Sequence, residues 1–114
     1  MDPETVEAVL SPAERALARS SQHPETIEIL TFSAKESVHK AVFPISQRWL
    51  EFSDVDVEFT AVTEIGSGLP YGAWGSFRPA PAPSLPARDA ELIRHLTGRY
   101  LIADRLVITL CRLG

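Results

Sequence analysis

Apolar residues recur at helical spacing in the first half of the chain and alternate with polar residues after it. Between residues 24 and 44 they fall three or four positions apart, which traces one face of an α-helix about five turns long. This stripe consists of Ile27, Leu30, Ala34, Val38 and Ala41. From residue 54 the period changes to two, which is typical of a half-buried strand. Its apolar members are Val55, Val57, Phe59 and Ala61.

Two shorter helices are expected before the long one. Asp2 and Pro3 can cap and start the first. Ser11 and Glu14 have the spacing of a capping box, with a proline at the first helical position between them, so the second helix is predicted from there to about residue 20. The long helix is expected to end at Pro44, because the residue before a proline disfavours the helical region.

The rest of the chain predicts a small antiparallel sheet. Residues 66–87 contain four glycines and five prolines, which indicates a loop with at most one edge strand near residues 76–78. A short helix is expected at 89–96, followed by strands at 99–103 and 106–112 joined by a tight turn at Asp104. Helices first and strands afterwards predict one α+β domain over residues 1–114, with the sheet packed on the long helix.

Composition narrows the class of protein. The chain has 114 residues, 45% of them apolar and 23% charged, which is typical of one globular domain. It has no apolar run long enough to span a membrane, and its single cysteine excludes an internal disulfide framework or a multi-cysteine zinc site. The net charge of -4 argues against general nucleic-acid binding. The opening residues lack the pattern of a signal peptide, so a cytoplasmic protein is expected.

The face of the long helix opposite its apolar stripe mixes charged and apolar residues. On a helical wheel, Glu36 and Lys40 lie there among Ile29, Phe32 and Phe43, with Lys35 and His39 at one edge. One interpretation is structural: Glu36 and Lys40 form an i,i+4 ion pair worth about 0.2–0.5 kcal/mol. The other is a site for metal and phosphate chemistry, formed by a carboxylate and an ammonium among apolar groups.

Residues 32–40, which read Phe-Ser-Ala-Lys-Glu-Ser-Val-His-Lys, resemble the diagnostic motif of the 4′-phosphopantetheinyl transferases. That motif is an aromatic, a small polar residue, any residue, Lys-Glu, Ala or Ser, two residues, and Lys. The flanking residues 41–44 and 48–52 are similar to the bacterial type that activates enterobactin and surfactin synthetases, and residues 96–109 are similar to its last hairpin. The resemblance spans about residues 9–113.

The resemblance implies an activity and roles for particular residues. Members transfer the 4′-phosphopantetheine arm of coenzyme A to a serine of a carrier protein and use Mg²⁺, here as part of secondary metabolism such as siderophore biosynthesis. It implies that Glu36 is a magnesium ligand that also helps to position or deprotonate the serine. Lys35 and Lys40 would contact the coenzyme A phosphates or assist proton transfer. Phe32 would hold the motif in place.

The chain resembles only the second half of the two-half bacterial enzymes. The first half brings a Gly-x-Asp-x-Glu motif, and the only Asp-x-Glu spacing near the start, at Asp2 and Glu4, fits a helix start better. The small members of the superfamily are homotrimers of about this length. Three readings therefore stay open: a transferase that is incomplete as an isolated half, a non-catalytic interaction module that pairs with another chain, and an unrelated α+β domain.

Several side chains are expected at interfaces. An uncovered half would show an apolar patch, for which Ile29, Phe32 and Phe43 are the candidates, and would form a homo-oligomer or pair with the missing N-terminal half. Arg48 could steer an acidic carrier protein. His39 is expected at the surface. Cys111 is expected to be a buried small apolar residue; Trp49 and Phe52 are expected in the core or an interface.

Overall fold

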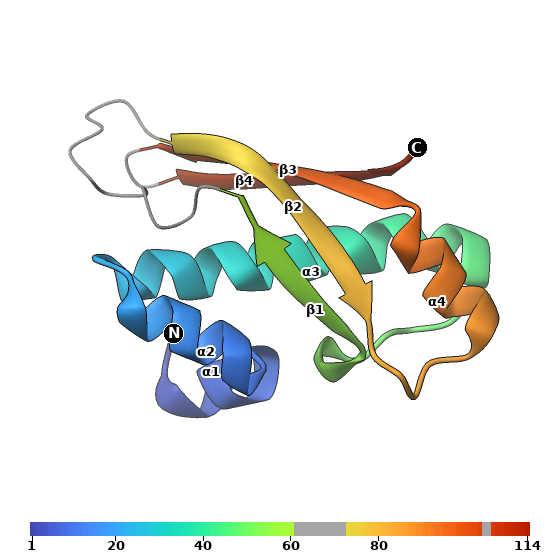
Figure 1. Cartoon of the computed structure of the whole chain (residues 1–114), viewed down its shortest axis with the longest axis horizontal. Helices are drawn as coiled ribbons and strands as arrows, with labels where there is room; N and C mark the ends of the chain where they lie inside the picture. The colour runs from blue at the N-terminus through green and yellow to red at the C-terminus, as the bar shows by residue number, and fades with distance from the viewer. Residues whose placement is uncertain (61–72, 104–105) are drawn as a thin grey trace.

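A four-stranded antiparallel sheet covered on one face by a long helix makes up the protein, as Figure 1 shows. The computed structural model describes residues 1–60, 73–103 and 106–114. The elements follow in the order α1 (Pro3–Val9), α2 (Pro12–Ser20), α3 (Pro24–Ser46), the 3₁₀ turn η1 (Phe52–Asp54), β1 (Val55–Phe59), β2 (Ala73–Pro81), α4 (Ala87–Arg94), β3 (Leu96–Ala103) and β4 (Leu106–Leu113). The predicted α+β fold is confirmed. In the part of the chain described, no helix could span a membrane.

The two N-terminal helices begin where their caps predict. The Asp2 carboxylate accepts a hydrogen bond of 2.8 Å from the backbone N–H of Thr5. Ser11 and Glu14 form the reciprocal capping box: the Glu14 N–H donates to Ser11 Oγ at 3.2 Å, and the Ser11 N–H donates to Glu14 Oε1 at 2.8 Å. Helix α2 packs beside the N-terminal part of α3, and α1 contacts η1 (Figure 1).

Helix α3 passes through Pro44, where we expected it to end, and continues to Ser46. The proline lies in the last turn, so its missing N–H costs only the helical hydrogen bond to the carbonyl of Lys40. Gln47 closes the helix in the left-handed conformation, with φ of 57°, and its N–H donates to the carbonyl of Phe43 at 2.8 Å. The expectation from Pro44 was therefore wrong by one half-turn.

Strand β2 occupies residues for which the sequence predicted a loop. It pairs with β1 from Val55↔Pro81 to Phe59↔Phe77, and with β3 only from Ala73↔Ile102 to Phe77↔Gly98. The Ala82 N–H donates to the Asp54 carbonyl, and the Thr60 N–H donates to the Ser76 carbonyl. The backbone N–H and C=O groups of even-numbered β2 residues are therefore directed toward β1.

The prolines of β2 are tolerated because of this register. Pro79 and Pro81 have odd numbers, so their nitrogens point to the other side of the strand, beyond the last pair with β3. A proline at such a place removes no ladder hydrogen bond. The edge strand allowed near residues 76–78 is therefore longer than expected, running over 73–81, and it is paired on both sides, so the loop prediction for the rest of this range was wrong. The strands expected at 99–103 and 106–112 are confirmed in slightly longer form, whereas residues 61–72 and the turn at Asp104 lie outside the described residues.

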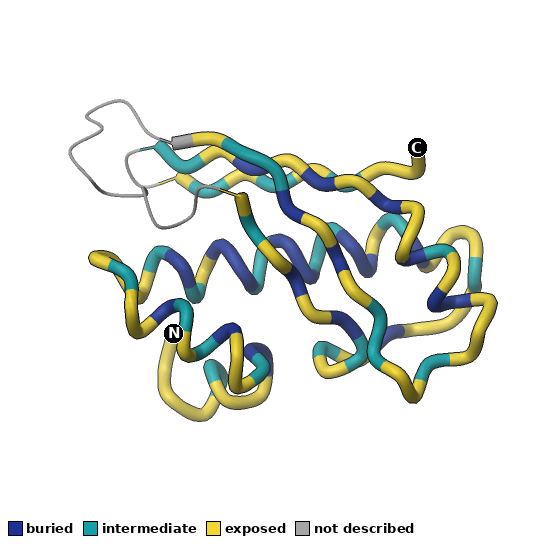
Figure 2. Tube along the Cα trace, viewed as in Figure 1, coloured by how far each residue is buried: buried dark blue, intermediate teal, exposed yellow. Residues whose placement is uncertain are grey.

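The core lies between α3 and the inner face of the sheet, where Figure 2 shows the buried positions of both. The predicted helical stripe is buried except for the partly buried Ala41. Alternate residues of the strands complete the core, among them Val57, Phe77 and Tyr100. Gly98 fits under the ring of Phe77, since a Cβ there would lie 2.3 Å from that ring.

We predict that Gly98→Ala destabilises the domain by about 1–3 kcal/mol, because the added methyl forces the buried Phe77 ring to move. Thermal and urea unfolding of the two proteins would measure the difference. Thr97→Ala, at the exposed neighbouring position of β3, is the matched control. Equal stability of Gly98→Ala and the parent would show that the ring does not depend on the glycine.

Candidate functional site

Lys35, expected at the edge of a functional face, lies instead in the core. Its side chain is fully buried, and its ammonium is 2.8 Å from Glu14 Oε1. The same Nζ donates to the carbonyls of Val9 at 2.7 Å and Phe52 at 3.1 Å. An ammonium has three protons, so these partners satisfy it completely. This placement gives no support to a contact between Lys35 and phosphate groups.

Glu14 connects this lysine to two other parts of the chain. It is 95% buried; its Oε1 caps the start of α2 at Ser11, and its Oε2 accepts the backbone N–H of Val57 at 2.8 Å. The pair Lys35–Glu14 therefore joins α1, α2, α3, η1 and β1. A buried charge is tolerated only when it is paired and hydrogen-bonded, as both of these are.

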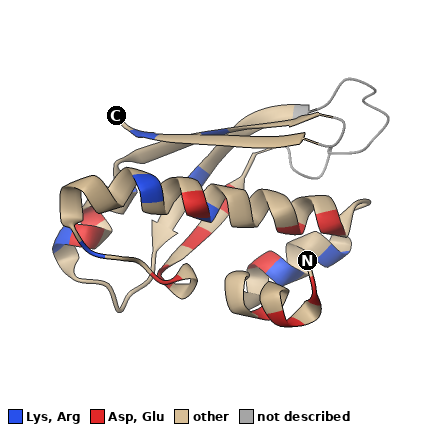
Figure 3. Ribbon diagram, turned by 180° about the vertical axis from the view of Figure 1, so that it is seen from behind, with Lys and Arg blue, Asp and Glu red and all other residues tan. Residues whose placement is uncertain are grey.

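Glu36 and Lys40 lie on the side of α3 that faces away from the sheet. Glu36 is partly buried and Lys40 is exposed. Within the described ranges neither has an ion-pair partner within 4 Å, so the i,i+4 pair considered from the sequence is not formed. Figure 3 shows the charged positions of α3 from this side of the molecule. The Glu36 carboxylate thus has free acceptor oxygens next to solvent.

Two serines of the motif tie α3 to the last strand. Ser33 Oγ and Thr109 Oγ1 are 2.8 Å apart, and Thr109 Oγ1 also donates to the Ser33 carbonyl at 2.9 Å. One turn later, Ser37 Oγ donates to the Thr109 carbonyl at 3.3 Å. Sequence reasoning missed these contacts; the signal was the small polar residue at two motif positions four apart, on the side of the helix that meets β4.

An aromatic cluster along α3 holds the segment that follows the helix. The Phe32 ring lies 5.6 Å from that of Phe52, which supports the expectation that Phe32 anchors the motif. His39 lies between Phe52, at 5.3 Å, and Trp49, at 5.9 Å. Phe43 contacts the other edge of Trp49, whose side chain is otherwise largely exposed.

His39 is buried, contrary to the surface position we expected. Only 4% of it is exposed, and neither ring nitrogen has a hydrogen-bond partner in the described part of the chain. Burial lowers the pKa of His39 below its ordinary value of 6.5, because the charged ring would lose its water; Glu36 opposes this shift and Lys35 adds to it. The histidine is therefore neutral at pH 7.

The helix that carries the Lys-Glu motif matches a known protein superfamily. The model of the 4′-phosphopantetheinyl transferase superfamily matches residues 1–76, which include α3 and the whole Lys-Glu motif. The chain belongs to this superfamily. It is also 30% identical, over 105 residues, to the 4′-phosphopantetheinyl transferase Npt of Nocardia iowensis. The match covers 91% of this chain and 46% of that protein, so the chain spans about half the length of this curated relative.

The site of this superfamily member is sparse in metal ligands. In the described residues no three His, Cys, Asp or Glu side chains gather at distances that could hold an ion. A single carboxylate still fits Mg²⁺, which is commonly bound through one or two carboxylates together with phosphate oxygens and water. Glu36 fits this use, because its carboxylate is at the surface and engages no other described side chain.

We predict that Lys35→Met destabilises the domain by about 3–5 kcal/mol, because it leaves the buried Glu14 carboxylate without its counter-ion. Lys40→Met, on the same helix, should change the free energy of unfolding by less than about 0.5 kcal/mol. Urea unfolding followed by circular dichroism compares them. Similar losses for both variants would contradict the structural role of Lys35.

The buried His39 predicts a pH dependence of stability. Because its folded pKa is lowered, the unfolded chain takes up a proton that the folded chain refuses as the pH falls through 6.5, and stability decreases. In His39→Phe, the free energy of unfolding should therefore fall less steeply as the pH decreases from about 7.5 to below 6.5. The measurement is the free energy of unfolding against pH, with His23→Gln, at an exposed position, as control. An unchanged slope in His39→Phe would refute the prediction.

Proposed function

We propose that this chain supplies one half of a Mg²⁺-dependent site that transfers 4′-phosphopantetheine from coenzyme A to a serine of an acyl or peptidyl carrier protein. The observation that carries the proposal is the rotation of α3 about its own axis, which decides which side chains point into the core. Lys35 is held in the core by Glu14, and this directs the next residue, Glu36, outward with free carboxylate oxygens. The superfamily match over the same helix supports the assignment.

The proposed chemistry matches the groups on this face. The serine oxygen forms a bond to the β-phosphorus of coenzyme A, the bond to the leaving 3′,5′-adenosine bisphosphate breaks, and the serine proton goes to a base. Bound Mg²⁺ would neutralise charge on the pyrophosphate. Glu36 would hold the ion and orient or deprotonate the serine, and Lys40, one turn along the helix, would bind phosphate oxygens.

Lys35 has a positioning role in this proposal. Its ammonium is occupied by three protein groups, so it acts through the orientation of α3 and not by contact with substrate. Arg48 remains our candidate for steering an acidic carrier protein. Its guanidinium is exposed and 3.5 Å from Asp89 on α4, which holds it at the end of α3.

The isolated chain is proposed to be an incomplete site. Its Lys-Glu motif offers one carboxylate, that of Glu36, and the chain spans about half of the Nocardia iowensis relative. This is also what favours the alternative of a non-catalytic module that pairs with another chain. The two readings differ in one respect: only the transferase half needs the Glu36 carboxylate.

A chimera tests the proposal, because it supplies the missing half. Residues 9–113 of this chain would replace the matched region of the Nocardia iowensis transferase, and mass spectrometry would follow the gain of phosphopantetheine by an apo carrier protein with coenzyme A and Mg²⁺. We predict transfer by the chimera, a loss of roughly 10²–10³-fold in rate for Glu36→Gln, and a smaller loss for Lys40→Gln.

Glu25→Gln is the matched control, since it removes an exposed carboxylate from the same helix outside the motif. Its rate should equal that of the chimera. A folded chimera that transfers equally well with Glu36→Gln would assign this half to the non-catalytic alternative. The isolated chain, assayed in parallel, should give no mass gain.

A further inference from the structure

Thr109 of the last strand makes a polar contact with the motif region of α3. Its Oγ1 donates to the Ser33 carbonyl at 2.9 Å, and it lies 2.8 Å from Ser33 Oγ and 2.5 Å from Ser37 Oγ. A threonine hydroxyl has one proton and two lone pairs. Because the proton is used at the Ser33 carbonyl, the lone pairs accept from the two serines. We call these three side chains the hydroxyl clamp.

The hydroxyl clamp also engages the backbone at the edge of the sheet. Strand β4 is the last in the order β1-β2-β3-β4, and the Gly114 N–H donates to the His95 carbonyl, so even-numbered residues of β4 bond to β3. The N–H and C=O of Thr109 therefore point toward the outer edge. There the Thr109 carbonyl accepts the Ser37 hydroxyl at 3.3 Å. The helix thus binds both a side chain and a main-chain group of the edge strand.

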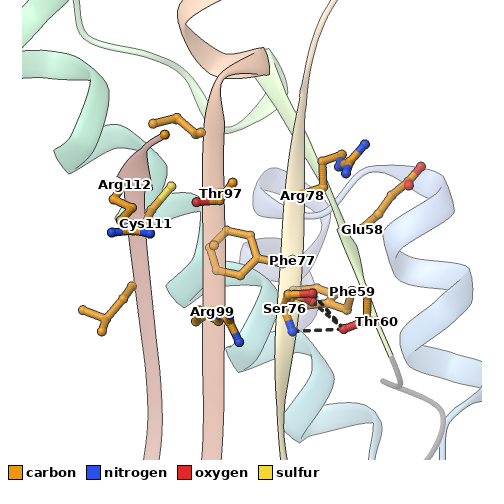
Figure 4. A pocket seen from close by; sticks show the side chains of 14 residues that line it. Glu58, Phe59, Thr60, Ser76, Phe77, Arg78, Thr97, Arg99, Cys111 and Arg112 are labelled. Carbon is orange, nitrogen blue, oxygen red and sulfur yellow. Dashed lines mark hydrogen bonds between the residues drawn. The ribbon is translucent and has the colours of Figure 1, made fainter.

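The even-numbered side chains of β4 belong to a different surface. Leu110 and Arg112 line a hollow on the face of the sheet away from α3, which Figure 4 shows together with Arg78 and Glu58. Successive side chains of a strand point to opposite faces. Thr109 therefore points toward α3, where it is half-buried. A substitution at Thr109 tests the helix contact separately from the side chains of that hollow.

The hydroxyl clamp and the buried ammonium of Lys35 hold α3 on opposite flanks. At about 100° per residue, Ser33 and Ser37 each lie about 160° around the helix axis from Lys35. The buried core positions of the helix lie between these flanks on one side, and Glu36 lies between them on the other. A contact on one flank alone would let the helix roll about that contact. Contacts on both flanks fix its rotation.

We infer that Thr109 is a positioning residue for Glu36: through Ser33 and Ser37 it fixes the rotation of α3 and hence the place of the Glu36 carboxylate. This inference rests on the proposed function, in which that carboxylate holds Mg²⁺. The ion demands nearly ideal octahedral geometry from its ligands. A misplacement of about 1 Å costs roughly 10²-fold in rate. Thr109 acts only through the helix, because its hydroxyl is occupied by the two serines.

Substitution of Thr109 in the chimera with the Nocardia iowensis transferase tests the inference. Thr109→Val keeps the shape of the side chain and removes its hydroxyl. We expect the transfer rate to fall roughly 10- to 100-fold, and the Mg²⁺ concentration at half-maximal rate to rise several-fold, because a displaced carboxylate binds the ion more weakly. Thr109→Ser keeps the hydroxyl and should restore both values to within a few-fold of the parent. A merely structural role would leave the Mg²⁺ requirement unchanged.

The double variant Ser33→Ala/Ser37→Ala removes the hydroxyl clamp from the helix side. Alanine has a higher helix propensity than serine, so this variant does not weaken α3 itself. Its rate should fall as far as that of Thr109→Val, and the triple variant should lose no more, because all three changes break one contact. Circular dichroism checks that each variant is folded. Thr26→Val, which removes a half-buried threonine hydroxyl from the first turn of α3, is the matched control and should equal the parent.

The full chain without the missing half gives a readout that does not depend on activity. In ¹H–¹⁵N NMR spectra, Thr109→Val should shift the amide signals of residues 35–40 by more than Thr26→Val does, because α3 changes its rotation. Thr109→Ser should shift them less than Thr109→Val. Signals of residues 35–40 that keep their parental positions in Thr109→Val would show that the hydroxyl clamp does not set the rotation of α3, and would overturn the inference.

The transfer assay separates this inference from the proposed function. Parental transfer by the Glu36→Gln chimera would contradict the proposed function itself and leave no carboxylate to position. Loss of transfer in Glu36→Gln together with a parental rate in Thr109→Val would overturn the inference alone. So would a loss in Thr109→Val that serine at this position does not restore, or a loss at an unchanged Mg²⁺ requirement.

Discussion

The ion pair between Lys35 and Glu14 fixes how the long helix is oriented on the rest of the protein. Both side chains are buried, and removing two charges from water is costly unless every group is satisfied. Here the carbonyls of Val9 and Phe52 accept the remaining hydrogen bonds of the ammonium, and the N–H groups of Ser11 and Val57 donate to the carboxylate. A rotation of α3 would break several of these bonds together. The outward direction of Glu36 follows from this network.

Local sequence signals predicted the elements whose boundaries depend on neighbouring residues. Caps placed the starts of α1 and α2, and the apolar stripe placed α3 on its core. The errors at Pro44 and in β2 have one origin: proline was judged without knowledge of its hydrogen-bonding partners. Pro44 costs one hydrogen bond in a last turn, and Pro79 faces a side of β2 that β3 no longer accompanies. Whether a missing N–H matters depends on tertiary register, which no local pattern contains.

The motif residues were identified from the sequence, whereas their environments were not. The resemblance singled out Lys35, Glu36 and Lys40, but spacing could not show that one of them is buried. Glu14 was recognised as half of a capping box; Val57, which donates to its second oxygen, and its lysine partner lie 43 and 21 positions away in the chain. The same holds for Thr109, which reaches two motif serines from the last strand, and for His39, whose burial depends on a segment that folds back over the helix.

The proposed catalytic groups lie on the outer side of α3, and the core of the domain lies between them and the sheet. In the described residues no three His, Cys, Asp or Glu side chains gather at distances that could hold an ion. The proposed metal shell would therefore be completed by groups that approach α3 from its outer side, where Ile29 and Phe43 are exposed.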